Sequence, residues 1–340
     1  MNIKVENITK KYGDFLALKD VSLSVNEGEL LALLGSSGCG KTTLLRIIAG
    51  LIEHNSGRIF LNDSDISDWP AQKRNTAMVF QNYALFPHMT LEENIAYGLK
   101  LRKLNKKEIN IKVMKVLEKV RLGGLGKRKI QELSGGQKQR AALARALVIE
   151  PDILLFDEPL SNLDEKLRVS MRKEIRRIQK DTGITSIYVT HDQREAMAIA
   201  DKIAIMDGGK ILQYGNVDDI YYRPENRFTA EFMGHINIFQ CSTQSSGQGK
   251  YIEFLGKRIE TESEKEIVDI ILRPEEVEIC DDGIEAEVTD IETMGPIIRY
   301  RLKAADYELY SDMLNKSVKR SIDYGDKVKI NFNENTLHIF

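Results

Sequence analysis

The glycine-rich segment that runs from Gly35 to Thr43 limits most strongly what this chain can fold into. Its sequence, Gly-Ser-Ser-Gly-Cys-Gly-Lys-Thr-Thr, matches the pattern G-x-x-x-x-G-K-[ST] in full. An apolar, strand-like run at Glu29–Leu34 precedes it, and a helical pattern at Thr43–Leu51 follows. Backbone N–H groups that curl round a phosphate need glycines, and the next helix offers the positive end of its dipole. The segment therefore predicts an α/β domain that binds the phosphates of a nucleotide.

The residue types in this loop assign a role to each position. Lys41 is expected to reach the β- and γ-phosphates, and the Thr42 hydroxyl is expected to join the shell of a Mg²⁺ ion. The other nucleotide-binding positions are Gly35, Ser36, Ser37, Gly38, Cys39, Gly40 and Thr43.

A second half of the site is expected at the end of another strand. Ile153–Phe156 is a continuous apolar run, typical of a buried parallel strand, and Asp157 and Glu158 follow it. Asp157 is predicted to hold Mg²⁺ through water, and Glu158 to act as the general base on the attacking water. Carboxylates after a strand often only cap the next helix, so this prediction depends on the phosphate loop upstream.

Strand and helix patterns alternate up to about residue 220, which predicts one large α/β domain with a mostly parallel sheet. Helical spacing marks 109–120 and 133–149, a long charged helix is expected at 165–182, and a strand at 186–190. After Gly234 the segments are short and alternate with period two, which predicts a small all-β domain. We therefore predict two domains, 1–233 and 234–340, joined through a helix at about 225–233.

Leu133-Ser-Gly-Gly-Gln137 opens one of these helices with a capping serine and a tight turn. Its hydroxyl, its glycine amides and the helix dipole also suit a second anion site. With this motif the chain resembles the nucleotide-binding subunits of ATP-binding cassette (ABC) transporters, for which Leu-Ser-Gly-Gly-Gln is the hallmark. The resemblance implies an ABC-type P-loop NTPase domain followed by a small OB-like regulatory (TOBE) domain. Ser36 stands where many relatives carry proline.

The same resemblance assigns further residues. It implies that Tyr12 stacks on adenine, that Gln81 reaches Mg²⁺ and the attacking water, and that His191 contacts the γ-phosphate. Without it, Tyr12 and His191 would be taken as ordinary structural side chains. Asp164 lies in the loop expected to cross a dimer interface. Two copies are expected to close head to tail, with ATP between the phosphate loop of one and four residues of the other, namely Ser134, Gly135, Gly136 and Gln137.

The resemblance also implies partners. Two integral membrane permease subunits are expected to dock near Gln81–Met89, where an apolar run would receive a short helix; these residues could instead belong to the domain's own core. A periplasmic or surface solute-binding protein would take part indirectly. No window approaches the ~18 consecutive apolar residues of a membrane span. Together with three widely spaced cysteines, this predicts a peripheral subunit on the cytoplasmic face of the membrane.

The C-terminal third resembles the regulatory domain of importer ATPases. The segments Gly295-Pro-Ile-Ile-Arg299 and Gly234-His-Ile-Asn-Ile-Phe239 look most like those of sulfate and thiosulfate importers, with ferric iron and spermidine/putrescine importers as alternatives. A non-transport ABC ATPase is a remoter alternative, because the stretch from Lys41 to Asp157 has no room for a long coiled coil. A formal charge of −2 and acidic runs such as Glu260–Glu266 speak against a nucleic-acid partner.

Overall fold

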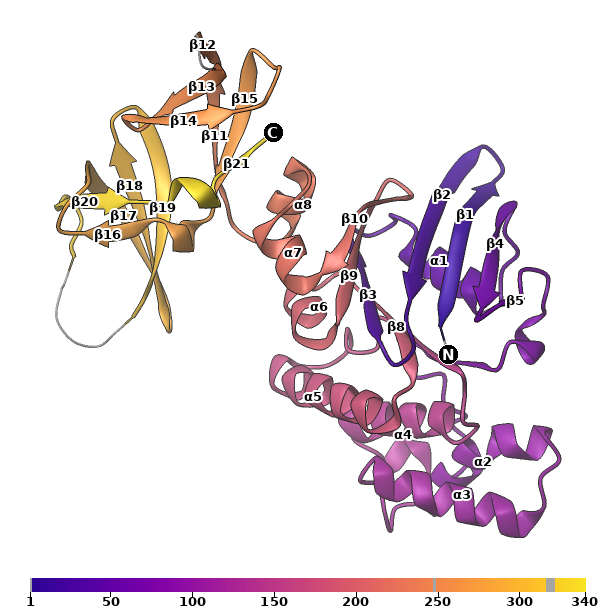
Figure 1. The fold of residues 1–340 in the computed structure, drawn as a ribbon. Coiled ribbons are helices and arrows are strands. Elements are labelled where there is room, and N and C mark those ends of the chain that lie inside the picture. The colour runs from indigo at the N-terminus through magenta and orange to yellow at the C-terminus, as the bar shows by residue number, and fades with distance from the viewer. Residues whose placement is uncertain (1, 247–248, 316–321) are drawn as a thin grey trace. The chain divides into compact units, whose positions relative to one another are not determined.

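The computed structural model describes residues 2–246, 249–315 and 322–340 (Figure 1). The chain forms two compact units, Met1–Val217 and Asp218–Phe340. Helices α7 (Val217–Tyr222) and α8 (Arg227–Phe232) thus lie almost wholly in the second unit. The domain boundary expected at 233/234 stays a prediction. None of the helices in the described ranges combines the length and the apolar character that crossing a membrane requires.

A six-stranded sheet forms the centre of the first unit, in the order β10-β9-β3-β8-β7-β6. Neighbouring strands are parallel except for β10, which runs antiparallel to β9 at one edge. This confirms the mostly parallel sheet. The strands are β3 (Leu30–Gly35), β6 (Thr76–Val79), β7 (Ile153–Asp157), β8 (Thr185–Thr190), β9 (Lys202–Asp207) and β10 (Lys210–Asn216).

Every residue of β3, β7 and β8 is buried, because structure covers both faces of the sheet. Leu30, Leu154 and Phe156 face a core shared with the larger helices, whereas Leu31, Leu33 and Leu155 face a second core shared with α1 and with a separate antiparallel sheet. That sheet has the order β2-β1-β4-β5. Its strands are β1 (Ile3–Tyr12), β2 (Phe15–Val25), β4 (Ser56–Leu61) and β5 (Ser64–Asp65).

The helices of the first unit agree with the predicted ones wherever a helix was predicted. The long helix expected at 165–182 is α5, with Asp164 as its N-cap and Gly183, at φ 64°, as its C-cap. The structure adds α2 and α6. The helices are α1 (Lys41–Ile48), α2 (Leu91–Leu101), α3 (Lys106–Lys119), α4 (Gly135–Leu147), α5 (Glu165–Thr182) and α6 (Gln193–Ile199).

After α8 the second unit consists mostly of strands, as predicted, packed around a core that includes Phe239, Phe254 and Leu302. Its sheets have the orders β11-β15-β21, β12-β13-β14 and β16-β20-β17-β18-β19. The strands are β11 (Asn237–Ser242), β12 (Gln244–Ser246), β13 (Gly249–Phe254), β14 (Lys257–Thr261), β15 (Ile267–Leu272), β16 (Glu278–Cys280), β17 (Ile284–Met294), β18 (Ile297–Ala304), β19 (Tyr307–Leu314), β20 (Lys327–Asn331) and β21 (His338–Ile339).

Candidate nucleotide-binding site

The phosphate loop joins β3 to α1 and is packed too tightly for side chains at two of its glycines. A Cβ on Gly35 would lie 2.2 Å from the Met206 carbonyl oxygen. Gly40 has φ +108°, and a Cβ there would lie 2.8 Å from the Ala17 carbonyl oxygen. Gly40 also begins α1 without a side-chain cap, so the first turn of the helix keeps donors for an anion.

Lys41 is buried and lies against the loop that it follows. Its Nζ donates to the carbonyl oxygens of Gly35 and Ser36, both at 2.8 Å, and lies 3.7 Å from Cys39 Sγ. The Ser36 hydroxyl donates to Asp207 Oδ1 at 3.3 Å. The loop is therefore held in a defined shape by its own lysine.

Asp157 ends β7 beside the start of α1. The Thr42 hydroxyl donates to Asp157 Oδ1 at 2.9 Å, and Arg46 Nη2 lies 3.7 Å from Oδ2. A hydroxyl and a carboxylate side by side form the all-oxygen donor set that Mg²⁺ prefers. Two of the three residues predicted to bind the metal, Thr42 and Asp157, are thus adjacent, and their chemistry fits the ion.

Glu158 and His191 follow the adjacent strands β7 and β8 and meet at their carboxyl ends. His191 Nδ1 lies 3.2 Å from Glu158 Oε2. Glu158 has a left-handed backbone, φ 44°, which is uncommon for a residue with a side chain. Its N–H donates to the Val189 carbonyl at 3.1 Å, and its carbonyl accepts from the Ser161 hydroxyl at 3.0 Å. These bonds hold the side chain at the strand edge.

Gln81 follows β6, and its exposed side chain is positioned through its backbone. The Asn162 side-chain amide donates to the Gln81 carbonyl at 3.0 Å. This contact joins the Gln81 segment to the loop that carries Asp164. Asp164 itself caps α5 by accepting from the Leu167 N–H at 3.0 Å.

The segment after Gln81 is held by the half-buried side chain of Arg145, which was not predicted to act there. Tyr83 and Ala84 both have left-handed backbones, and their carbonyls accept from the two terminal nitrogens of Arg145 at 3.0 and 2.6 Å. Burial lowers the pKa of Arg145. Tyr83 and Leu85 pack partly against the helical core, so part of the expected docking run serves the fold.

The signature residues form a complete cap at the start of α4. The Ser134 N–H donates to Gln137 Oε1 at 2.9 Å, and the Gln137 N–H donates to Ser134 Oγ at 3.4 Å. A Cβ on Gly136 would lie 2.9 Å from Leu167 Cδ1, so the helix starts close against α5. Ser134 and Gly135 are exposed to solvent.

Tyr12 lies at the β1–β2 turn, paired with Phe15. Its ring is 47% exposed, and the Lys10 ammonium lies 4.9 Å from the ring centroid. An aromatic face open to solvent suits stacking on a base.

A buried carboxylate behind His191 was missed by the sequence analysis. Glu195 accepts from the Thr190 hydroxyl at 2.9 Å and from the Tyr188 hydroxyl at 3.1 Å, and burial raises its pKa. Arg168 Nε lies 3.6 Å from the same carboxylate. A cavity of about 50 Å³ between Glu195 and Glu158 is lined by these groups. The only signal in the sequence is a glutamate one turn into the helix after His191.

Comparison with known families gives two matches. A family described as ABC transporter matches residues 18–161, and one described as TOBE domain matches residues 270–340.

Similar proteins span nearly the whole chain. The "Fe(3+) ions import ATP-binding protein FbpC" of Fusobacterium nucleatum is 44% identical over 347 residues, covering 100% of this chain and 93% of that protein. The "Spermidine/putrescine import ATP-binding protein PotA" of Acetivibrio thermocellus is 42% identical over 345 residues, covering 99% and 96%. Among solved structures, a dimeric post-hydrolysis state of the ATP-binding cassette MJ0796 bound to ADP and Pi is 30% identical, with a TM-score of 0.57. It covers 63% of this chain and 98% of that one.

The phosphate loop, the carboxylates at the end of β7 and the signature cap thus occur in a chain whose relatives are import ATPases over their full length. The chain therefore belongs to the ABC transporter family, as an ATP-hydrolysing subunit of the importer class with a C-terminal TOBE domain.

Proposed function

We propose that this chain drives solute import by hydrolysing ATP with Glu158 as the general base. The observation that carries the proposal is the pair formed by Glu158 and His191, 3.2 Å apart at the edge where Asp157 and Thr42 also meet. A carboxylate next to the γ-phosphate position can take a proton from the attacking water, and a neighbouring imidazole can orient it. Lys41 supplies a positive charge for the β- and γ-phosphates.

Mg²⁺ would be held by Thr42 and Asp157, with Gln81 as the third proposed ligand. When bound, the ion neutralises charge on the phosphate oxygens. Gln81 is carried by a segment whose carbonyls are fixed by Asn162 and Arg145, so its placement is set by the protein.

Two copies of the chain are proposed to close around ATP, with the signature residues of one facing the phosphate loop of the other. The dimeric solved relative supports this arrangement. Ser134 and Gly135 are exposed, which is required of residues that contact ATP bound to another copy of the chain. ATP that binds the closed pair better than the open pair drives closure, and hydrolysis releases it.

The Gln81–Met89 segment is the proposed contact for two permease subunits in the membrane, which would place the chain at the cytoplasmic face with a solute-binding protein beyond it. Arg145 and the buried Asn94 hold this segment, and Asn94 exchanges two hydrogen bonds with Phe86. A closure-dependent shift of Gln81 would therefore be passed to the outer part of the segment.

Ferric iron is the solute that we propose to test first. Two of the relatives described above are named for ferric iron and for spermidine and putrescine. The sulfate and thiosulfate prediction receives no support from them.

The decisive variant is Glu158→Gln, which keeps the shape of the side chain and removes the base. We expect it to bind ATP and to hydrolyse it about 10²–10⁴-fold more slowly. Glu53→Gln, an exposed glutamate in the same unit, is the matched control and should retain full turnover. Turnover of Glu158→Gln close to that of the control would remove Glu158 from the role.

Uptake of labelled ferric iron in cells that lack the native protein then tests the solute. Complementation with the wild-type chain, but not with Glu158→Gln, should restore uptake, and excess spermidine or sulfate should not compete. If neither version changes iron uptake although the wild-type chain hydrolyses ATP, the proposal of ferric iron as the solute is refuted. The proposal that the chain is an ATP-hydrolysing subunit is then unaffected.

A further inference from the structure

The segment that runs from the end of α2 through α3 to residue 129 carries a strong excess of positive charge, and Glu92 and Glu93 at the start of α2 lie outside it. Residues 100–129 contain twelve Lys and Arg but two Asp and Glu, a formal charge of +10 in a chain whose total is −2. The remainder of the chain is therefore acidic, at −12. This separation of charge creates a positive electrostatic potential around the segment, although the net charge of the protein is close to zero.

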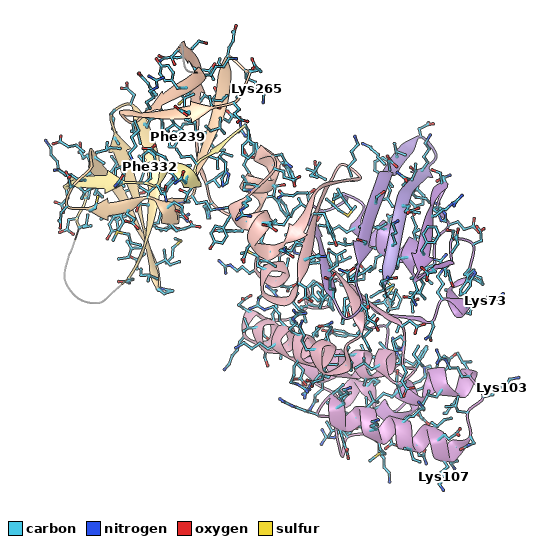
Figure 2. The ribbon with its side chains drawn as sticks, in the orientation of Figure 1. Lys73, Lys103, Lys107, Phe239, Lys265 and Phe332 are labelled. Atoms are coloured by element: carbon cyan, nitrogen blue, oxygen red, sulfur yellow. The ribbon has the colours of Figure 1, made fainter. Side chains whose placement is uncertain are left out.

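Four lysines gather where α2 ends and α3 begins. Lys100, Lys103, Lys106 and Lys107 are exposed, and within the described ranges no ammonium group of the four makes a hydrogen bond or an ion pair. Figure 2 shows Lys103 and Lys107 at the outer end of α2 and α3, pointing away from the rest of the first unit. We call these four residues the lysine tip.

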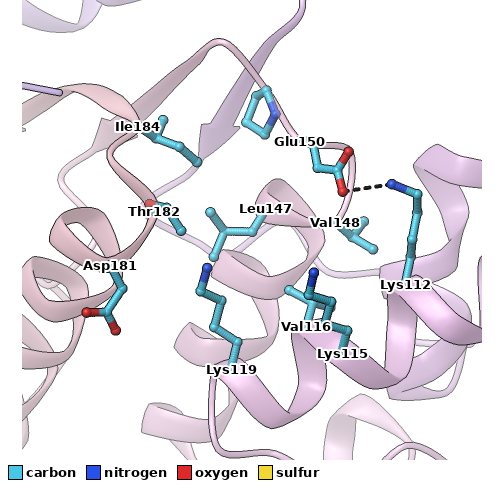
Figure 3. A pocket seen from close by; sticks show the side chains of 11 residues that line it. Lys112, Lys115, Val116, Lys119, Leu147, Val148, Glu150, Asp181, Thr182 and Ile184 are labelled. Atoms are coloured by element: carbon cyan, nitrogen blue, oxygen red, sulfur yellow. Dashed lines mark hydrogen bonds and ion pairs between the residues drawn. The ribbon is translucent and has the colours of Figure 1, made fainter. Parts of the chain in front are cut away.

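Two other cations of this segment have polar partners. Arg102 donates to Asn75 Oδ1 and to the Ile149 carbonyl, and Lys112 pairs with Glu150 at 2.7 Å. Lys112 lines a cavity of about 360 Å³ together with Lys115 and Lys119, and Figure 3 shows all three beside its apolar floor. These lysines line a partly acidic pocket. Lys100 and Lys106 of the lysine tip line a second pocket with Glu92 and Glu93, whereas Lys103 and Lys107 line neither.

Exposed aliphatic side chains accompany the lysine tip. Leu101 lies between two cations of the tip and is 68% exposed. Ile111 and Met114, at 60% and 48% exposed, continue from Lys107 along one face of α3 with spacings of four and three residues. Lysines around an exposed aliphatic anchor form the pattern that binds an anionic bilayer surface, where the ammonium groups meet phosphates and the apolar chain enters the headgroup layer.

We propose that the lysine tip and Leu101 bind the anionic phospholipid surface of the membrane directly. The partner is a lipid surface rather than a nucleic acid, because the anchors beside the lysines are mainly aliphatic and stacking on bases needs aromatic rings. The contact would act in addition to the proposed permease docking and would hold the ATPase close to its permease when the two separate. The choice of a membrane as the source of phosphate rests on the proposed importer function.

The test measures binding of the full chain to sedimented vesicles of phosphatidylglycerol and phosphatidylcholine in equal parts. Changing all four tip lysines to Gln should lower the partition coefficient by roughly 100- to 1,000-fold, at roughly fivefold for each lysine near an anionic surface. Leu101→Ser should weaken binding with little change in its salt dependence, since it removes apolar contact but no charge. The matched control changes four exposed lysines elsewhere, Lys73, Lys210, Lys265 and Lys303, to Gln and alters the net charge equally.

The outcomes separate the two proposals. Selective loss in the tip variant, with ATP hydrolysis intact, supports the lipid contact. Equal losses in the tip variant and the control, equal binding to pure phosphatidylcholine, or preferential binding of single-stranded RNA would overturn it. A chain that hydrolyses ATP but never binds the vesicles loses only the lipid contact, whereas a chain without hydrolysis loses the proposed function.

Discussion

Arg74 is a buried arginine that fixes the far end of the helix carrying Lys41 and Thr42. It is 3% exposed, and its guanidinium donates to four carbonyl oxygens. Two of these carbonyls lie at the end of α1 and belong to Ile47, at 2.7 Å, and Ile48, at 2.9 Å. The other two belong to the loop before Arg74, those of Ser67 at 2.8 Å and Trp69 at 2.7 Å.

Arg74→Met keeps most of the side-chain volume and removes all four bonds. All four carbonyls lose a charged donor, and that of Ile47 keeps another partner, the Gly50 N–H at 3.0 Å. Each such bond contributes about 1.5–3 kcal/mol, and removing a buried cation returns part of that sum. Burial does lower the pKa of Arg74, which shows that the charge is costly there. We expect a net loss of about 3–4 kcal/mol in the free energy of unfolding.

Urea unfolding followed by tryptophan fluorescence reports on the first unit, which contains Arg74. Trp69 is the only tryptophan in the sequence and lies in the affected loop. Arg74→Lys, with one compact donor group, should fall between the wild type and Arg74→Met. Arg128→Met, an exposed arginine of the same unit, is the control and should stay within about 0.5 kcal/mol. If Arg74→Met lowers the free energy of unfolding by no more than about 1 kcal/mol, the estimate based on its hydrogen bonds is refuted.

Three further variants test other parts of the first unit. Gly40→Ala should abolish binding of a fluorescent ATP analogue, because the residue has φ +108° and no room for a Cβ; retained binding would show that the loop can relax. Ser134→Ala should lower stability by about 1 kcal/mol through loss of the α4 cap, and should also lower ATP-dependent dimerisation measured by gel filtration; unchanged dimerisation would limit the serine to capping. Asp201 has a lowered pKa: burial raises it, but hydrogen bonds from Arg176, from the Leu30 N–H and from a lysine outweigh burial. Asp201→Asn should therefore cost about 2–3 kcal/mol at neutral pH, and in urea titrations this difference should shrink as the pH falls below the ordinary value of 3.8; a pH-independent difference would contradict the assignment.

The sequence predicted those helices and strands whose first and last residues are set by neighbouring residues in the chain. The limits of α5 match because Asp164 caps its start and Gly183 ends it, and both signals stand in the sequence. α2 was missed, although Thr90 and Glu93 form a capping box at its start. The antiparallel sheet has a weaker signal in the sequence, because register shifts within β1 interrupt the alternation that marks a strand.

The residues of the site also differ in whether neighbouring residues in the sequence predict them. Lys41, Thr42, Asp157 and Glu158 lie in contiguous motifs, and the structure brings them to one edge of the sheet. Contacts such as Asn162 with Gln81 or Arg145 with Ala84 join residues 81 and 61 positions apart, and no spacing rule in one sequence reveals them. Such pairs depend on how helices pack on the sheet, which only the folded chain defines.

The bonds that Lys41 makes within its own loop have a thermodynamic consequence for nucleotide binding. Two of the three ammonium protons lie on the carbonyls of Gly35 and Ser36, and the third faces the weakly accepting sulfur of Cys39. An arriving phosphate can accept a hydrogen bond from the third N–H of the ammonium group while the other two bonds remain. Folding has thus already ordered the loop, and association should show in calorimetry a small heat-capacity change, without the large negative value of coupled folding.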